Sequence, residues 1–92
     1  MNHILIEFYM MTDKLAAARA KIDLLDRRIT ALLVRRFALA VSMKGLKKKV
    51  TDKAREKFVL ANARRAAGVK IYAAGAAAVF SEIIKQSKKL QA

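Results

Sequence analysis

The chain has 92 residues, with 20 Lys and Arg against 7 Asp and Glu, which gives a formal net charge of +13. Its length allows one small domain. The absence of cysteine excludes disulfide scaffolds and cysteine-based zinc or redox sites, and a hydrophobic fraction of 55% excludes an intrinsically disordered chain. The positive charge suits either a polyanion such as a nucleic acid or a small anionic ligand held in a pocket.

Residues 1–11 are interpreted as an N-terminal extension, and residues 12–92 as a single helical domain. The apolar stretch of the extension contains Glu7, has no basic region before it and is shorter than a secretory signal. No segment approaches the roughly 18 consecutive apolar residues of a membrane span. We therefore expect a cytoplasmic protein with no membrane association.

A long amphipathic helix is predicted over about residues 13–47. Apolar side chains recur in it with a seven-residue period, in one register at Leu15, Ile22, Ile29 and Met43. At about 1.5 Å per residue the helix is about 50 Å long, more than the remaining residues can cover. Because many of the apolar residues are small alanines, the core of one chain is also thin, so we expect self-association.

Two shorter helices are predicted after it. Thr51 or Asp52 is suited to cap a helix that runs to Ala67, where Gly68 suits the left-handed position after a helix end. A third helix is predicted over about residues 70–91. Since no segment has a strand pattern, we predict an all-α fold of three helices with a long N-terminal helix.

The third helix carries one apolar stripe whose continuation is polar. The stripe consists of Tyr72, Ala76, Val79, Phe80, Ile83 and Ile84. The same face continues as Ser87 and Gln91. These two residues belong either to a fraying helix end or to a polar pocket.

Arg36 stands in the apolar register of the first helix, where the other members are Leu15, Ile22, Ile29 and Met43. A buried guanidinium without a partner is costly. One interpretation is a register-setting or solvent-reaching arginine, and the other is an anion site in the core. Lys47 shares this face three turns later, so both cations could converge on one small anion.

Asp52, Arg55 and Glu56 form a second polar cluster at the start of the second helix. Its spacing suits either a solvated capping and ion-pair group or the wall of a binding site. Combined with Arg36, Lys47, Ser87 and Gln91, it would make a pocket without an evident nucleophile or metal-ligand set. Such a pocket suits electrostatic rather than covalent chemistry.

Over about residues 14–91 the sequence resembles the all-helical class of chorismate mutase. The matching strings are ARAKID at 18–23, LD at 25–26, RR at 35–36, Lys47, DKARE at 52–56 and IIKQSKKLQ at 83–91. The resemblance implies an intertwined homodimer that converts chorismate to prephenate by a Claisen rearrangement, in phenylalanine and tyrosine biosynthesis. It implies no cofactor, no metal and no covalent intermediate.

The resemblance also implies roles for individual residues. Arg19 and Arg36 would bind the two substrate carboxylates, and Lys47 and Gln91 would hydrogen-bond the ether oxygen. Twenty-eight residues separate Arg19 from Lys47, about 42 Å of helix, so they cannot meet on one small molecule. Arg19 is therefore expected from the other subunit of an antiparallel helix pair.

The second and third helices would complete the site. By the same resemblance, Asp52 and Glu56 hold the ring hydroxyl of the substrate, and Arg55 and Ser87 complete the pocket. The rearrangement of chorismate is unimolecular, and negative charge develops on the ether oxygen as the C–O bond breaks. A fixed ammonium and an amide donor stabilise that charge, and the arginines hold the reactive conformer.

Two departures from the family pattern affect the site. Only four residues lie between Lys47 and Asp52, so the first helix could end early and Lys44 or Lys48 could take the place of Lys47. Position 91 is Gln where some members have Glu, so we expect activity that changes little across neutral pH.

Three alternatives stay open at this point. A related activity on the same fold removes pyruvate from isochorismate with a similar set of residues. The clusters at 44–49 and 85–89 would suit a nucleic-acid binder, but the aromatic residues are few and lie apart from the basic runs, which argues against nucleic acid. A homologue that binds without catalysing is disfavoured because all eight expected positions hold usable residues.

Overall fold

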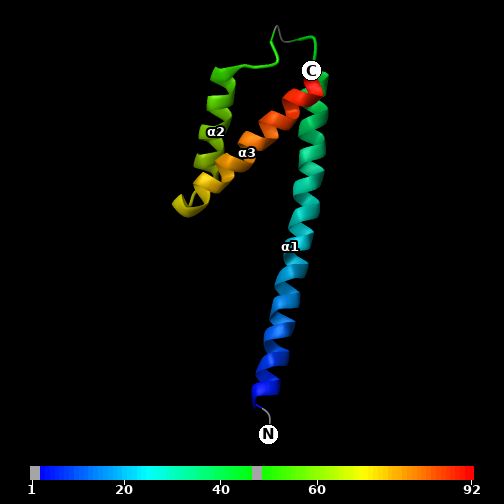
Figure 1. The fold of residues 1–92 in the computed structure, drawn as a ribbon, viewed down its shortest axis with the longest axis vertical. Coiled ribbons are helices and arrows are strands. Elements are labelled where there is room, and N and C mark those ends of the chain that lie inside the picture. The colour runs from blue at the N-terminus through cyan, green and yellow to red at the C-terminus, as the bar shows by residue number, and fades with distance from the viewer. Residues whose placement is uncertain (1–2, 47–48) are drawn as a thin grey trace. The chain divides into compact units, whose positions relative to one another are not determined.

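The computed structural model describes residues 3–46 and 49–92 and has three helices (Figure 1). They are α1 (His3–Ser42), α2 (Lys53–Ala67) and α3 (Lys70–Gln91), and no strand occurs among the described residues. The predicted all-α class and the order of one long and two shorter helices are confirmed.

The bounds of α1 differ from the prediction at both ends, because it begins at His3 rather than near Asp13 and ends at Ser42 rather than at Lys47. Inside the helix, the Thr12 hydroxyl donates to the Phe8 carbonyl oxygen at 2.9 Å, so Thr12 does not interrupt it. At the other end the chain turns, and Gly45 adopts a φ of 91° that favours glycine.

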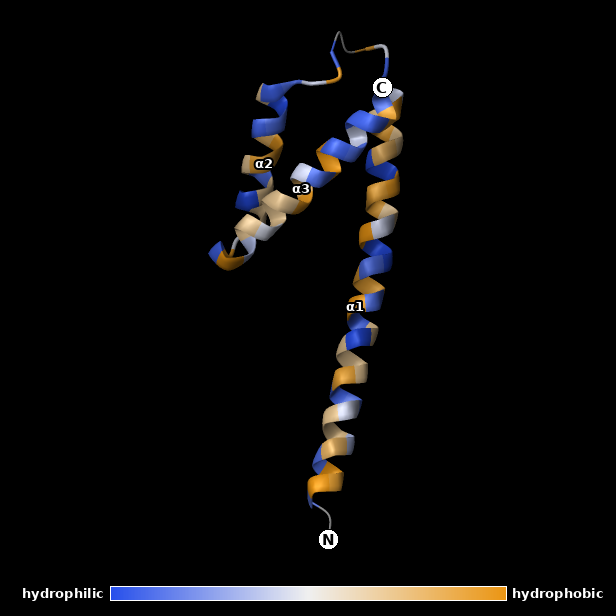
Figure 2. Ribbon diagram, in the orientation of Figure 1, coloured by the Kyte–Doolittle hydropathy of each residue, from blue (hydrophilic) through white to orange (hydrophobic). Residues whose placement is uncertain are grey.

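By contacts the chain divides into two units, residues 1–35 and residues 36–92, and α1 runs through their boundary. In the first unit every described residue is exposed on its own chain except Leu33, which is half-buried. Figure 2 shows apolar and polar residues alternating along α1. The apolar register, with Ile22 and Ile29 each 53% exposed, finds no cover within this unit.

In the second unit α2 and α3 pack against each other. The N-cap of α2 is Asp52, one of the two residues proposed from the sequence, and its Oδ1 accepts a hydrogen bond from the Arg55 backbone N–H at 3.0 Å. Gly68 ends α2 with a φ of 70°, and its backbone N–H donates to the Arg65 carbonyl oxygen. This positive φ lets the chain reverse into α3 within two residues.

The buried face of α3 differs in part from the predicted stripe. Tyr72 and Val79 are 64% and 58% exposed, whereas Ala77 is buried and only 5% exposed. Small side chains at Ala77 of α3 and Ala63 of α2 are among the most buried in this unit. Close packing of two helices favours small side chains at the contact, so alanines form much of this buried face. The prediction missed them because it relied on the large apolar side chains.

Candidate functional site

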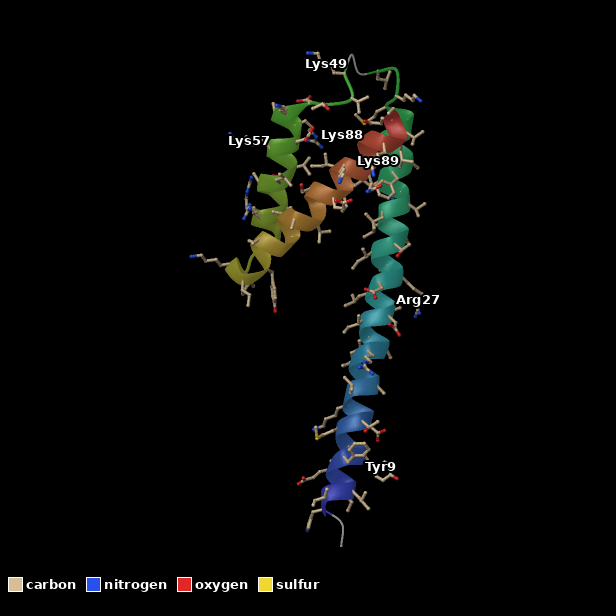
Figure 3. All side chains as sticks on the ribbon, viewed as in Figure 1. Tyr9, Arg27, Lys49, Lys57, Lys88 and Lys89 are labelled. Atoms are coloured by element: carbon tan, nitrogen blue, oxygen red, sulfur yellow. The ribbon has the colours of Figure 1, made fainter. Side chains whose placement is uncertain are left out.

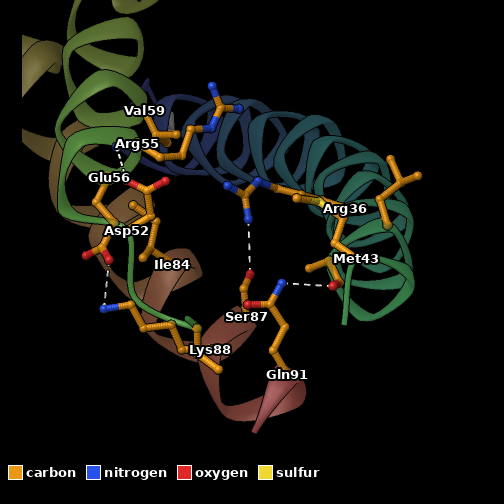
Figure 4. Close-up of a pocket in the computed structure, with 13 residues that line it drawn as sticks. Arg36, Met43, Asp52, Arg55, Glu56, Val59, Ile84, Ser87, Lys88 and Gln91 are labelled. Carbon is orange, nitrogen blue, oxygen red and sulfur yellow. Dashed lines mark hydrogen bonds and ion pairs between the residues drawn. The ribbon is translucent and has the colours of Figure 1, made fainter. Parts of the chain in front are cut away.

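The candidate site is a pocket of about 290 Å³ that lies entirely within the unit 36–92 (Figure 4). All three helices contribute side chains to its wall, together with Met43 and Val50 from the connection between α1 and α2. Six of the eight predicted site residues line it, namely Arg36, Asp52, Arg55, Glu56, Ser87 and Gln91. The helical hairpin and the last turns of α1 therefore gather residues that are up to 55 positions apart in the sequence.

Arg36 points from α1 into this pocket. Its Nη1 donates to Ser87 Oγ at 3.0 Å, and Ser87 Oγ in turn donates to the Ile83 carbonyl oxygen at 2.8 Å. Ser87 is only 7% exposed, and Arg36 is half-buried. The side chain is thus held by α3 rather than released to solvent, which favours the anion-site interpretation over that of a solvent-reaching arginine.

Gln91 joins the end of α3 to the end of α1. Its Nε2 donates to the Ala40 carbonyl oxygen at 2.8 Å, and the residue is 8% exposed. Ala40 belongs to the last turn of α1, where carbonyl groups lack partners within the helix. The contact fixes the amide in the pocket wall, so Gln91 belongs to the packed structure and not to a fraying end.

Glu56 of α2 faces Lys88 of α3 across the pocket wall. Lys88 Nζ lies 2.9 Å from Glu56 Oε2, and the two side chains are 31% and 27% exposed. Lys88 was not among the predicted site residues. A signal for it existed, because Ile84, Lys88 and Gln91 follow one another at helical spacing of four and three residues on the pocket-lining face of α3.

Asp52 and Arg55 have local roles besides lining the pocket. The Asp52 carboxylate caps α2, so the capping interpretation is confirmed for this residue. The Arg55 guanidinium lies 5.2 Å from the centre of the Phe58 ring, a cation–π contact within α2. Both residues are exposed on the isolated chain, so their side chains form the rim of the pocket.

Two predicted residues are not in this set. Lys47 lies outside the residues that the structure describes, and Arg19 is an exposed residue of the first unit that does not line the pocket. The predicted substitute Lys44 is described. Its Nζ donates to the Ala92 carbonyl oxygen at 3.4 Å, and it does not line the pocket either.

Apolar side chains make up much of the remaining wall. Leu39 and Met43 line the pocket from the end of α1, and Val59 and Ile84 line it from the α2–α3 hairpin. A pocket with apolar walls and a few fixed polar groups is typical of small-molecule sites. Within 3–46 and 49–92, no group of three or more His, Cys, Asp or Glu is arranged to hold a metal ion.

No helix within 3–46 and 49–92 combines the length and the hydropathy that crossing a membrane requires.

The family model described as chorismate mutase type II matches residues 18–92. All eight predicted site residues fall within the matched range, from Arg19 to Gln91. No curated protein and no solved structure matches the chain.

Proposed function

Since this chain belongs to the chorismate mutase type II family, we propose that it converts chorismate to prephenate in the cytoplasm, in the synthesis of phenylalanine and tyrosine. The observation that carries the proposal is the half-buried Arg36 guanidinium, hydrogen-bonded to the buried Ser87 in a pocket of about 290 Å³. A cation held in such a place is stabilised by a bound anion.

Arg36 binds one carboxylate of the substrate. A guanidinium carries five N–H donors in a planar fork, so the contact with Ser87 Oγ is compatible with a two-point pair to a carboxylate. Ser87 sets the orientation of the fork because its hydroxyl is itself tied to the Ile83 carbonyl. The clamp is therefore largely formed before the substrate arrives, which reduces the entropy lost on binding.

The second carboxylate is bound by Arg19 of a second subunit in an intertwined homodimer. One observation supports this arrangement. The apolar register of α1 is exposed on the single chain, with Leu15 at 50% and Ile22 and Ile29 at 53%. An antiparallel pair of α1 helices would bury this register and bring Arg19 of one subunit towards the pocket of the other.

The reaction itself needs charge stabilisation and conformer selection. Lys47 and Gln91 donate to the ether oxygen, where negative charge develops as the C–O bond breaks, and no covalent bond to the protein forms. Arg19 and Arg36 hold the two carboxylates so that the reacting carbon atoms approach each other. Glu56 and Asp52 hold the ring hydroxyl, and Arg55 completes the positive rim.

The decisive experiment is a turnover assay with purified protein. We expect loss of chorismate and formation of prephenate in a one-to-one ratio, identified by chromatography and mass spectrometry. Salicylate and pyruvate formed from isochorismate, without turnover of chorismate, would assign the lyase reaction instead. Tight, salt-sensitive DNA binding with neither turnover would favour the nucleic-acid alternative.

A further inference from the structure

The ion pair between Lys88 and Glu56 joins the two helices that form one side of the pocket. Glu56 is on α2 and Lys88 is on α3, and both line the pocket. The 2.9 Å distance joins Lys88 Nζ to Glu56 Oε2, which is a buried oxygen atom. Among the described residues Oε2 makes no hydrogen bond of ordinary geometry, so the Lys88 ammonium is the group that compensates its charge.

The other cations of the pocket wall are engaged elsewhere. Arg36 donates to Ser87 Oγ, and the guanidinium of Arg55 lies over the Phe58 ring. Glu56 is thus paired with Lys88 by the packing of α2 on α3, as Figure 4 shows. One carboxylate oxygen is held by this pair, and the second, Oε1, belongs to the same rigid planar group.

We propose that Lys88 is a positioning residue, which holds the Glu56 carboxylate through Oε2 so that Oε1 accepts the hydrogen bond of the substrate's ring hydroxyl. This inference rests on the proposed function, since it concerns the hydroxyl of that substrate. Lys88 itself does not touch the substrate in this arrangement. Its contribution is to keep the half-buried Glu56 carboxylate in one orientation, as partners of ligating groups do elsewhere.

The alternative is that Lys88 binds a substrate carboxylate directly, as a further cation of the pocket. The two roles make different predictions for a double-mutant cycle. A residue that acts through Glu56 has no further effect once Glu56 is replaced. A residue that contacts the substrate independently has the same effect with or without Glu56.

The experiment measures kcat and KM for chorismate in the full chain and in the variants Lys88→Met, Lys88→Arg, Glu56→Gln and the double variant Lys88→Met with Glu56→Gln. Methionine keeps an unbranched side chain of similar length and removes the charge. Lys89→Met is the matched control, because Lys89 is the next residue on α3 (Figure 3), is exposed and does not line the pocket. Circular dichroism and the oligomeric mass establish that each variant is folded.

We expect Lys88→Met to raise KM about tenfold while kcat changes less than about twofold, because the hydroxyl contact is made equally in the ground state and the transition state. Lys88→Arg restores most of the affinity, and Lys89→Met resembles the parent chain. Added to Glu56→Gln, Lys88→Met has less than about a twofold further effect.

The outcomes separate this inference from the function on which it rests. A parent chain without turnover of chorismate overturns the proposed function and this inference with it. An active parent chain in which Lys88→Met is silent, or in which its effect multiplies with that of Glu56→Gln, overturns the positioning role alone.

Discussion

The unit 1–35 and the unit 36–92 differ in whether their own residues cover their apolar side chains. The first is one helix whose regular apolar register stays exposed, with Ile22 and Ile29 at 53%. The second folds back on itself through Gly68 and buries Ala63, Ala77, Ser87 and Gln91. A helix whose apolar side chains recur regularly along one face thus needs a partner helix to cover them. The α2–α3 hairpin instead buries its small side chains within the same chain.

The two units also differ in their content of charged residues. Residues 1–35 contain six basic and four acidic residues, and residues 36–92 contain fourteen basic and three acidic ones. The excess of positive charge therefore belongs to the unit that contains the pocket. In the proposed function this field attracts a substrate with two carboxylates, over and above the few cations that contact it.

The largest effect that we expect comes from Arg36→Ala. Removing the guanidinium leaves a substrate carboxylate without its clamp and Ser87 without its donor, and kcat/KM falls by about a thousandfold or more. The measurement is chorismate consumption at substrate concentrations well below KM. Arg35→Ala is the matched control, since Arg35 is an exposed neighbour in α1 that does not line the pocket.

An equal loss in both variants, or near-parent activity of Arg36→Ala, would contradict the assignment of the clamp. Lys47→Ala is expected to have an effect of the same order, with the helical content retained.

The next effect tests whether the two units act across subunits. Arg19→Ala and Arg36→Ala are each nearly inactive alone, but a subunit-exchanged mixture regains about a quarter of the parent activity, because about half of the dimers are mixed and one of the two sites in each mixed dimer is intact. The mixture is prepared by unfolding and refolding equal amounts of the two variants. The absence of recovery, with mixed dimers detected by mass spectrometry, would place Arg19 outside the partner's site.

A smaller change concerns the exposed register of α1. Ile29→Lys introduces a charge into the face that an antiparallel pair would bury, so the dimer dissociates to monomers at micromolar concentration. Thr30→Lys, at the next position, is expected to leave the mass unchanged, since Thr30 lies outside the apolar register and its hydroxyl donates to the Asp26 carbonyl of its own helix. Analytical ultracentrifugation measures both, and equal behaviour of the two variants would refute the proposed interface.

The smallest effect concerns pH. The Gln91 amide does not titrate, so kcat/KM of the parent chain is expected to change less than about threefold between pH 5 and 8. Gln91→Glu makes the donor depend on a protonated carboxyl, so its activity rises as the pH falls. A steep loss in the parent chain over this range, or a Gln91→Glu profile parallel to it, would show that Gln91 is not the donor.

Local signals in the sequence were reliable where a cap or a glycine marks an end. Asp52, one of the two predicted caps, and Gly68 mark the ends of α2, and α3 runs over the predicted range 70–91. The start of α1 carries no such signal, and Thr12 donates within the helix to the Phe8 carbonyl, whereas Gly45 follows the other end with a positive φ. The apolar periodicity therefore did not fix where α1 begins, and the helix starts at His3.

The site residues also differ in how well the sequence predicted them. Arg36, Ser87 and Gln91 were predictable because each is a polar residue where an apolar one is expected. Lys88 was missed, because it stands among the lysines at 85, 88 and 89, and its shared helical face with Ile84 and Gln91 does not show which acidic residue it pairs with. Only the packing of α3 against α2 places its ammonium 2.9 Å from Glu56 and leaves Lys89 exposed.

The order of residues alone thus predicted the helical class, the family and six residues that line one pocket, because periodicity and spacing act along the chain. The tertiary structure decided which partner each polar group has: Ser87 for Arg36, the Ala40 carbonyl for Gln91, and Lys88 for Glu56. Those pairings depend on distances between helices, and a distance of about 3 Å is set only when side chains pack in three dimensions.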